Sequence, residues 1–564
     1  MDQNRRIIFF FKVINIWMTD YFLKYNHFSI LKNYILKDPL CDWFEIHKDH
    51  RVYQKDDISY YKDYIIKESK SYKEKVFREI KDLSKLNIPL ITSEERTKEL
   101  IHSDFPLILQ GRLLNKDNLY VTCDIIIKYS LFRKLFSNIT NLPFHLLCLK
   151  NDYLLINLTY ASLHFKMDLK DVNNDGLIPY KKCSLYAFQE KFFELSGEKC
   201  HCFLMGKDYY YKKTLLPKKE FICKVSFDEN IRNTYLNAVQ WIQSLKNNYQ
   251  EMNILPEPSH LELYPNMNYK ESGWENEKIK LADKIKEITL VWNISYDERC
   301  RLVEQGIKCW DDPKLLKELK ETKKKDIQER MIHMNQQKDV LIHPRKNIST
   351  GLSEILERTT YDIYFDVESF LSFDGKQNLF NDSIPLEEPV LGILGFIHND
   401  KFYEFTISNF TKAGEEQIVQ SFSKYLWNMS NDNKEINIYH WGHAEYNYFR
   451  YIHETYPQIM FPSYKLINVL DYFRMEPIIV QGVFKFGLKS IGKALYKNNL
   501  IQTTWEENDN GLDSMLQFKD ICKAHTKNIP LKRYLGIKEI IDYNRIDCQV
   551  LYEIVELLRD KYKR

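Results

Sequence analysis

The sequence predicts an α/β protein with several domains. The chain has 564 residues, more than a single hydrophobic core organises, so we expect about two to four domains. Hydrophobic residues make up 44% of the chain and aromatic residues 14%, which is typical of a folded protein. Strand-like runs alternate with helical periodicity in both halves, and this alternation is the pattern of α/β domains.

Charge and cysteine content narrow the class of protein. The net charge of +3 is too small to indicate a nucleic-acid partner by itself, so a basic groove would have to be local. The 11 cysteines form no CxxC pair, and we interpret them as reduced thiols in a cytosol-like compartment. The apolar run after Arg5-Arg6 is interrupted by Lys12 and is not followed by a small-residue cleavage site. We therefore expect an amphipathic first helix, no membrane span and no secretion.

The pattern of helical and strand-like segments in residues 1–250 predicts a first α/β domain. Helical periodicity covers the first ~35 residues, then Tyr60–Leu86 and Asn230–Lys246. Apolar runs rich in β-branched residues lie between these helices and predict strands. These runs are Leu107–Gln110, Leu119–Lys128, Tyr153–Tyr160 and His201–Gly206.

Residues 251–355 predict a linker and a helical connector. Residues 251–277 include Pro256, Pro258 and Pro265 and show little periodicity, and the pattern becomes helical from Lys278 onward. The run Lys323–Lys325 is typical of a solvated helix face, with a contact to DNA as the alternative.

Residues 356–564 predict a second α/β domain that ends in helices. Its strands are expected at Tyr361–Phe370, Pro389–His398, Lys401–Ile407, Ile436–His440 and Leu466–Tyr472.

The strand Tyr361–Phe370 carries two acids, Asp366 and Glu368, in otherwise apolar surroundings. Side chains alternate between the faces of a strand, so both carboxylates point to one side, about 7 Å apart. Two like charges on a buried face are costly unless a cation lies between them, and carboxylate oxygens suit Mg²⁺ or Mn²⁺. The alternative is a strand end with two solvated acids.

Glu445 is expected in the first turn of a helix that follows the strand Ile436–His440 and a turn at Gly442. The carboxyl ends of strands in open α/β sheets are where binding sites form. The alternative is an acid that only complements the helix dipole.

The helix near the end of the chain carries Asp547 within an apolar stripe, with Tyr543 one turn earlier on the same face. A carboxylate in a stripe that faces the core needs a partner, and the acids Asp366 and Glu368 with a metal ion would provide one.

Two further residues are candidates for substrate binding. Asp471, at the end of a predicted strand, would assist the metal site or cap the structure, and Lys489 would contact a phosphate or be an ordinary surface lysine. Aromatic residues nearby would stack on unpaired bases or pack in the core, and we favour core packing for each of them. They are Phe370, Phe373, Phe484 and Trp505.

In the first half, a strand with Asp124, a second strand and a helix with Lys181, Lys182 and Tyr186 follow one another. Over about residues 42–213 this order resembles the RecB-like branch of the PD-(D/E)xK nucleases.

The residues that such a nuclease uses for chemistry are largely replaced. The resemblance implies a (D/E)-x-Lys on the second strand and a Gln on the helix, where this chain has Asn157-Leu158-Thr159 and Ser184. A threonine cannot orient the attacking water as lysine does. We expect an inactive nuclease fold, with Glu74 and Asp124 as remnants, that serves as a scaffold or holds DNA.

The second half contains, in order, Asp366 and Glu368, then Glu445, then Tyr543 and Asp547, with the strings YHWGHAE, LDYF, FGLKSI and DYNRIDC. This set resembles the DEDDy branch of the DnaQ-like exonucleases, which have a ribonuclease-H-like fold, although Glu445 stands where those enzymes have Asp. It is more similar still to YprB-type domains joined to a RecB-like half, found in bacteria and large DNA viruses.

The connector adds to this resemblance. The segment from Ile288 to Ile307, followed by Trp310, resembles the helix-hairpin-helix unit between the two halves of RecB/YprB-type proteins. Asn293–Tyr296 stands where the Gly-x-Gly hairpin would be, so we expect a structural adaptor.

The resemblance implies a site with two Mg²⁺ or Mn²⁺ ions. Asp366, Glu368 and Asp547 would bind one ion, Asp366 with Glu445 would help to hold the second, and Tyr543 would orient the attacking water.

The function implied is metal-dependent hydrolysis of phosphodiester bonds, most directly 3′→5′ on single-stranded or frayed DNA during replication, repair or recombination. RNA is the alternative substrate. The expected location is the cytoplasm, or a viral replication compartment within it, and protein partners stay unknown. A second hypothesis is a nucleic-acid-binding scaffold without activity, against which the retained acids and Tyr543 argue.

Overall fold

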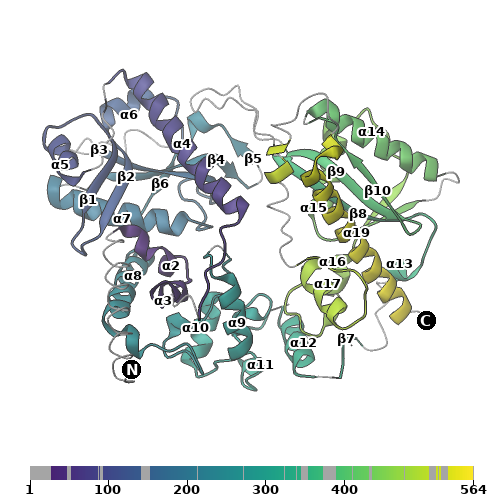
Figure 1. Ribbon diagram of the computed structural model, residues 1–564. Coiled ribbons are helices and arrows are strands. Elements are labelled where there is room, and N and C mark those ends of the chain that lie inside the picture. Colours follow the sequence, from purple (N-terminus) through teal and green to yellow (C-terminus); the bar gives the residue numbers. More distant parts are fainter. Residues whose placement is uncertain are drawn as a thin grey trace, which may run out of the picture. The chain divides into compact units, whose positions relative to one another are not determined.

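The computed structural model of the chain has a mixed α/β fold with several sheets (Figure 1). Among the helices that it describes, none combines the length and the apolarity that a membrane crossing requires. The described residues are 27–47, 52–86, 88, 93–141, 153–197, 199–212, 214–270, 272–322, 324–337, 339–344, 353–371, 389–409, 411–430, 435–475, 477–506, 516–518, 520–521 and 531–562.

Contacts within the chain divide it into two compact units, with the main boundary between Glu287 and Ile288. We call the described residues of 27–58 and 62–287 unit 1, and those of 59–61 and 288–562 unit 2. The boundary falls inside the connector expected for residues 251–355. The division into residues 1–250, 251–355 and 356–564 stays a prediction.

Unit 1 is built on one mixed sheet. Its strands follow the order β1-β2-β3-β4-β5, and β6 also pairs with β4. β3 and β4 are parallel, whereas the other pairs are antiparallel. The strands are β1 (Leu107–Leu114), β2 (Tyr120–Lys128), β3 (Tyr153–Phe165), β4 (His201–Tyr211), β5 (Thr214–Leu216) and β6 (Cys223–Val225). The four predicted strands are present, and β1, β3 and β4 extend beyond their predicted ends.

Alternation along the strands gives this sheet two buried faces. Ile125 and Ile127 of β2 pack in the core beneath α4 (Tyr60–Ser84), and Ile126 packs in the core on the opposite face, with α7 (Ile178–Ser196) and α8 (Glu229–Asn248). Of the helix expected for the first ~35 residues, residues 1–26 lie outside the described part. The other helices of unit 1 include η1 (Phe28–Leu31), α2 (Lys32–Ile35), α3 (Leu40–Ile46), α5 (Glu94–His102), α6 (Tyr129–Leu135) and α9 (Glu275–Ile285).

The helical part of the expected connector continues into unit 2. Helix α10 is capped by Ser295, whose hydroxyl accepts a hydrogen bond from the backbone N–H of Glu298 at 3.2 Å. Lys324 donates to Asn293 at 3.0 Å, so this lysine is engaged within the chain, and Lys323 lies outside the described residues. The elements are α10 (Tyr296–Glu304), α11 (Leu315–Glu318), α12 (Lys325–Gln336), β7 (Ile342–His343) and α13 (Ser353–Leu356).

Unit 2 is built on a second mixed sheet, in the order β10-β9-β8-β11-β12. β8 pairs antiparallel with β9, and β9 with β10, whereas β11 is parallel to both β8 and β12. The strands are β8 (Asp362–Leu371), β9 (Pro389–His398), β10 (Lys401–Thr406), β11 (Ile436–His440) and β12 (Tyr464–Asn468), and a short β13 (Ile479–Val480) pairs with β7. Because β8 is the central strand, both of its edges are hydrogen-bonded to neighbouring strands.

The two faces of β8 pack against different helices. Ile363 and Phe365 belong to the core that includes α14 (Lys412–Met429) and α15 (Ala444–Thr455). Tyr364 belongs to the other core, with the long C-terminal helix α19 (Leu535–Tyr562). That second core also includes residues of α16 (Val469–Met475) and α17 (Leu488–Lys497).

A buried arginine fixes α19 against the start of β8. Arg559 is 4% exposed, and its guanidinium donates to the carboxylate of Asp362 at 2.7 Å. It also donates to the hydroxyls of Tyr364 at 2.7 Å and Tyr439 at 3.1 Å, and to the carbonyl of Ile355 at 2.8 Å. These bonds satisfy the buried charge from several sides, so they set where α19 lies along the strand.

The strand predicted for Leu466–Tyr472 is wrong in its second half. β12 ends at Asn468, and Val469 begins helix α16, so Asp471 lies in the first turn of a helix. Asn468 pairs with His440, the last residue of β11, and the ladder ends there because its neighbour ends. The apolar pattern alone did not show the length of the neighbouring strand.

Candidate metal centre

Three carboxylates meet between β8 and α19. Asp366 and Glu368 lie two residues apart on the face of β8 that also carries Tyr364, as the period of two predicts. Asp547 comes from α19 and is 8% exposed. One carboxylate oxygen from each of the three acids lies within 4.8 Å of the other two. The structure therefore brings together oxygens of three of the four predicted metal ligands.

Crowding and burial raise the pKa values of these acids. For Asp366, burial is the largest cause, and the charges of Asp547 and Glu368 raise its pKa further. Burial and the charge of Asp547 likewise hold the pKa of Glu368 well above its usual range. Burial raises the pKa of Asp547 from 3.8 to about 7, although the hydrogen bond from Trp505 and the charge of Lys489 oppose this shift. Ionising all three acids together is therefore costly unless a cation joins them.

Glu445 lies beside this group, in the first turn of α15. β11 ends at His440 and Gly442 makes the turn with a φ of +107°, as the sequence indicated. Glu445 is 5% exposed, and its charge raises the pKa of Asp366. Its Oε2 lies 3.5 Å from Nδ1 of His440 and accepts no hydrogen bond from the residues that the structure describes. Glu445 stays outside the set of oxygens within 4.8 Å, yet it offers a buried carboxylate oxygen to a cation.

Tyr543 and Trp505 hold the carboxylate of Asp547. Tyr543, one turn earlier on α19, hydrogen-bonds to Asp547 and lowers its pKa. The indole Nε1 of Trp505 donates to Oδ1 of Asp547 at 2.7 Å. Trp505 is 4% exposed, so it packs in the core as we favoured and also contacts an acid. Gly492 makes room for this ring, because a Cβ at position 492 would lie 2.8 Å from it.

Lys489 lies beside the acids. Its ammonium is 4.6 Å from the ring centre of Tyr543 and 5.9 Å from that of Trp505. Its charge lowers the pKa values of Glu368 and Asp547. Both alternatives for this lysine, a contact to phosphate and an ordinary surface lysine, stay predictions.

Asn544 belongs to the site but was missed in the sequence. It is completely buried, and its amide Nδ2 donates to Oδ2 of Asp366 at 2.7 Å. A second hydrogen bond from Asn544 lowers the pKa of Glu368. Gly395 of β9 accommodates the amide, because a Cβ at that position would lie 1.6 Å from Oδ1 of Asn544. The only signal in the sequence was a polar residue between Tyr543 and Asp547, and nothing local linked it to Gly395.

The other candidates lie away from the acids or are engaged elsewhere. Asp471 accepts a hydrogen bond from Nδ2 of Asn468 at 2.8 Å, and Oδ1 of Asn468 accepts from the backbone N–H of Gly442 at 2.8 Å. This chain of bonds braces the turn before α15, which fits the capping alternative for Asp471. Phe484 packs against Trp310, with ring centres 5.0 Å apart. The side chain of Phe370 and all of Phe373 lie outside the described part.

In unit 1, Asp124 forms an ion pair with Lys73. Its Oδ1 lies 2.6 Å from Nζ of Lys73, and its Oδ2 accepts from the backbone N–H of Leu158 at 2.8 Å. The backbone N–H of Asp124 donates to Oδ1 of Asn157 at 3.0 Å. Glu74, expected as a second remnant, is exposed on α4. The neighbouring lysine, and not Glu74, thus reaches the acid.

Side chains of α7, the helix that follows β3, pack within unit 1. Tyr186 packs edge-on against Phe227 and Tyr235, with ring centres 5.5 and 5.6 Å away. Ser184, which stands where the resemblance implies Gln, is buried at 7% exposure.

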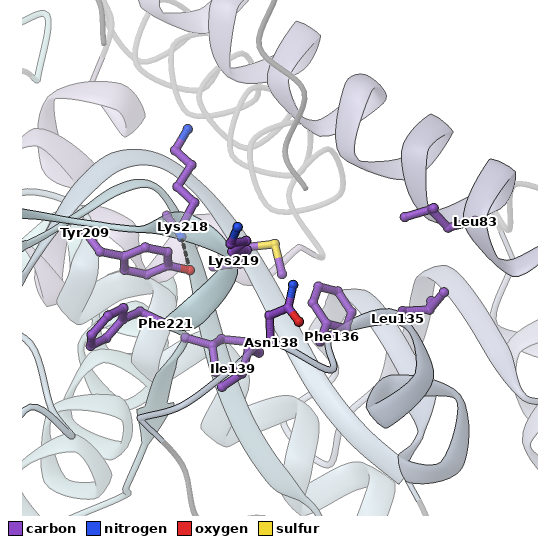
Figure 2. A pocket seen from close by; sticks show the side chains of 12 residues that line it. Leu83, Leu135, Phe136, Asn138, Ile139, Tyr209, Lys218, Lys219 and Phe221 are labelled. Carbon is purple, nitrogen blue, oxygen red and sulfur yellow. Dashed lines mark hydrogen bonds between the residues drawn. The ribbon is translucent and has the colours of Figure 1, made fainter. Parts of the chain in front are cut away.

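Unit 1 also holds a cavity of about 200 Å³ near the end of α4. Figure 2 shows Leu83, Leu135 and Phe136 on one side of it and Tyr209 and Phe221 on the other. The lining is largely apolar and includes none of the predicted catalytic acids. The cavity is therefore separate from the acid cluster.

No family model matches the chain, and neither a curated protein nor a solved structure matches it. The chemistry of the site thus rests on the residues themselves. Asp366, Glu368 and Asp547 offer only carboxylate oxygens, the ligands preferred by Mg²⁺ and Mn²⁺, with Glu445 nearby. The raised pKa values fit a divalent cation, and so does Oε2 of Glu445, which accepts no hydrogen bond from the described residues.

Proposed function

We propose that unit 2 is a metal-dependent nuclease that hydrolyses phosphodiester bonds, most directly as a 3′→5′ exonuclease on DNA. The observation that carries this proposal is the convergence of Asp366, Glu368 and Asp547, whose carboxylate oxygens lie within 4.8 Å of one another although they come from elements about 180 residues apart. Carboxylate oxygens gathered in this way are the ligands that a divalent metal ion of a nuclease would need.

The topology of unit 2 supports a ribonuclease-H-like fold of the DEDDy type. The central strand β8 has antiparallel neighbours on one side and parallel ones on the other, and it carries the first two acids. The third acid and Tyr543 lie on the last helix, as the resemblance implies.

In the proposed reaction, different residues hold the metal ions, orient the attacking water and contact the substrate. Asp366, Glu368 and Asp547 would hold one ion, and Asp366 with Glu445 would help to hold a second. Bound ions would supply an activated water and stabilise the leaving oxygen. Tyr543 is uncharged at neutral pH and accepts or donates a hydrogen bond, which suits it to orienting water. Lys489, whose ammonium lies over the ring of Tyr543, would contact a phosphate of the substrate.

For unit 1 we infer a RecB-like fold without nuclease activity. The ammonium of Lys73 at 2.6 Å already neutralises Asp124, and Asn157 and Thr159 replace the acid and the lysine that cleavage would need. This observation favours a second candidate function for the whole chain, a nucleic-acid-binding scaffold.

The test is degradation of end-labelled single-stranded DNA and RNA in Mg²⁺ or Mn²⁺ by the wild type and by Asp366→Ala. We expect metal-dependent shortening from the 3′ end that the variant loses. Arg545→Ala, which alters an exposed ion pair with Asp542 on the same helix, is the matched control. Binding without cleavage of either polymer would exclude the enzyme and leave the scaffold, and cleavage of RNA alone would reassign the substrate.

A further inference from the structure

The cavity in unit 1 has the size of a site for one small ring system. Its volume is about 200 Å³, and its lining includes none of the acids of the proposed metal centre. An apolar cavity of about 150 Å³ is large enough to bind benzene, whereas sites for drug-sized ligands begin at roughly 300 Å³. The cavity therefore fits a single flat ring system and excludes a larger molecule.

The lining of the cavity is apolar over most of its surface and basic on one side. Met205 and Phe136 are 7% and 6% exposed. Lys218 and Lys219 also line the cavity, and Figure 2 shows them on the side of Tyr209. Unfilled space within a protein is costly, because the atoms around it lose dispersion contacts. A lining that joins apolar side chains to two cations favours a ligand that has both a ring and a negative charge.

Hydrogen bonds hold two walls of the cavity together. One wall includes the segment after α6, and the other includes the segment before β6. The backbone N–H of Thr140 donates to the carbonyl of Glu220 at 2.8 Å. Nδ2 of Asn141 donates to the carbonyl of Ile222 at 2.9 Å, and its Oδ1 accepts from the backbone N–H of Ile222 at 3.2 Å. The walls are thus fixed before a ligand enters, which lowers the cost of ordering them on binding.

The polar side chains of the lining match the parts of a nucleotide. Among the described residues, the lining has Lys218 and Lys219 and no acid. Nζ of Lys218 lies 3.4 Å from Oδ1 of Asp208, and this contact orients the ammonium. The amide of Asn138 both donates and accepts hydrogen bonds, as the edge of a base requires, and a lysine binds phosphate as a point charge. Aromatic side chains such as Phe221 supply surface against which a base packs.

We propose that this cavity binds one base of single-stranded nucleic acid, with Lys218 and Lys219 at the adjoining phosphate. A base within a duplex is stacked on both faces and cannot enter such a space, so the strand must be single. The choice of nucleic acid rests on the proposed function of unit 2, whereas the ring and the anion follow from the lining itself. Unit 1 then holds a strand through an unpaired base and needs no metal ion.

The first test uses full-length protein and deoxythymidine monophosphate (dTMP) in EDTA, with saturation-transfer difference NMR as the measurement. Without a metal ion the acids of unit 2 repel a phosphate. Because Leu83 lines the cavity and is 47% exposed, Leu83→Trp should block the space without disturbing the core. Ile66→Trp is the control, at a position of the same helix that is 56% exposed and outside the lining.

We expect transfer to the base protons of dTMP from the wild type and from Ile66→Trp, and its loss with Leu83→Trp. Transfer that persists in Leu83→Trp, or no transfer from the wild type, would overturn the cavity as the site.

The second test separates the phosphate from the base by titration calorimetry. Lys219→Met is expected to weaken binding of dTMP about tenfold and to leave binding of thymidine, which lacks the phosphate, unchanged. Lys191→Met is the control, because this lysine pairs with Glu194 at the surface. Equal losses for dTMP and thymidine would overturn the contact between Lys219 and phosphate. Inorganic phosphate that binds as tightly as dTMP would overturn the role of the base.

Competition identifies the source of the nucleotide. Single-stranded oligothymidylate is expected to displace dTMP at a lower concentration than free dTMP requires, because neighbouring phosphates add contacts. Binding of dTMP that the oligonucleotide does not displace would overturn the assignment to a strand.

These measurements are independent of cleavage because no metal ion is present. Failure of dTMP to bind would overturn this inference and leave the nuclease intact. Absence of metal-dependent cleavage by the wild type would overturn the nuclease and leave the binding result to stand.

Discussion

Asn544 is an uncharged residue among acids, and its amide ties two of them together. It donates to Oδ2 of Asp366 at 2.7 Å and also hydrogen-bonds to Glu368. Hydrogen bonds to the ionised form of a carboxylate lower its pKa, which counters part of the effect of burial. A single amide therefore orients both carboxylates and makes it less costly to ionise them.

Replacing Asn544 with Ala should weaken metal-dependent cleavage without removing any predicted ligand. We expect a loss of about 10–100-fold in metal affinity or activity, the usual effect of removing a group that orients metal ligands. The measurement is cleavage rate against Mn²⁺ concentration. Asn447→Ala, at an exposed position on α15, is the control and should match the wild type. Equal rates for both variants would show that Asn544 does not orient the acids.

Trp505 affects the same site through one hydrogen bond. Its indole N–H lowers the pKa of Asp547, so Trp505→Phe should raise that pKa and move the acidic limb of the pH–rate profile to higher pH. Trp427→Phe is the control, because Trp427 is 49% exposed and its indole N–H donates to the carbonyl of Met460, away from the acids of the site. A profile that stays in place while the maximal rate falls would mean that the indole serves packing alone.

At the scale of elements, the site exists because α19 lies against the face of β8 that carries the acids. Arg559 of α19 binds Asp362 at the start of β8. Asp547 lies about three turns before Arg559 on the same helix, close to Asp366 of β8. The helix is thus held at one point and positions its acid at another. A shift of α19 along β8 would separate the carboxylates.

Breaking this contact should be costly. Arg559→Met leaves Asp362 buried without its cation, and we expect a loss of about 3–5 kcal/mol in the free energy of unfolding. Urea unfolding is the measurement. Arg545→Met breaks an ion pair between exposed side chains and should cost less than about 1 kcal/mol. Because the penalty comes from the uncompensated Asp362, adding Asp362→Asn to Arg559→Met should restore part of the loss.

The convergence of two elements also makes stability depend on pH. The folded, metal-free protein binds a proton at Asp547 up to about pH 7, whereas the unfolded chain releases it near 3.8. The raised folded pKa therefore stabilises the protein at low pH, and this contribution is lost as the pH rises through about 7, by up to about 1.4 kcal/mol per pH unit. In EDTA, the stability of the wild type relative to Asp547→Asn should fall between pH 5 and pH 8. A constant difference would show that Asp547 is not perturbed, and added Mn²⁺ should oppose the fall.

The features of the site that could be predicted from the sequence are those that depend on residues close together in the chain. The period of two placed Asp366 and Glu368 on one face, and the apolar stripe marked Asp547 as buried, because both signals lie within one element. Asn544 with Gly395, and Arg559 with Asp362, were missed because each pair joins residues that are far apart in the chain. The end of β12 was misplaced for the same reason, since it is set by the length of β11.

At the scale of the whole molecule, the two units differ in how the charge of the acids on their sheets is balanced. Unit 2 gathers carboxylates, and we propose that a cation from solution balances their charge. Unit 1 supplies Lys73 from its own helix α4 to Asp124. Only unit 2 should therefore respond to divalent metal.

Calorimetry of the full chain tests this division. The units have separate hydrophobic cores, so we expect two unfolding transitions, which Leu204→Ala in unit 1 and Val555→Ala in unit 2 should assign by lowering one each. If Mn²⁺ binds the folded acid cluster and not the unfolded chain, as we propose, it should stabilise unit 2 by RT ln(1 + [L]/Kd), about 2.7 kcal/mol at a hundred times Kd. Asp366→Asn should abolish that increase. If Mn²⁺ raised the transition of unit 1 instead, the assignment of the metal centre to β8 and α19 would be wrong, and Lys73 would not replace a metal ion at Asp124.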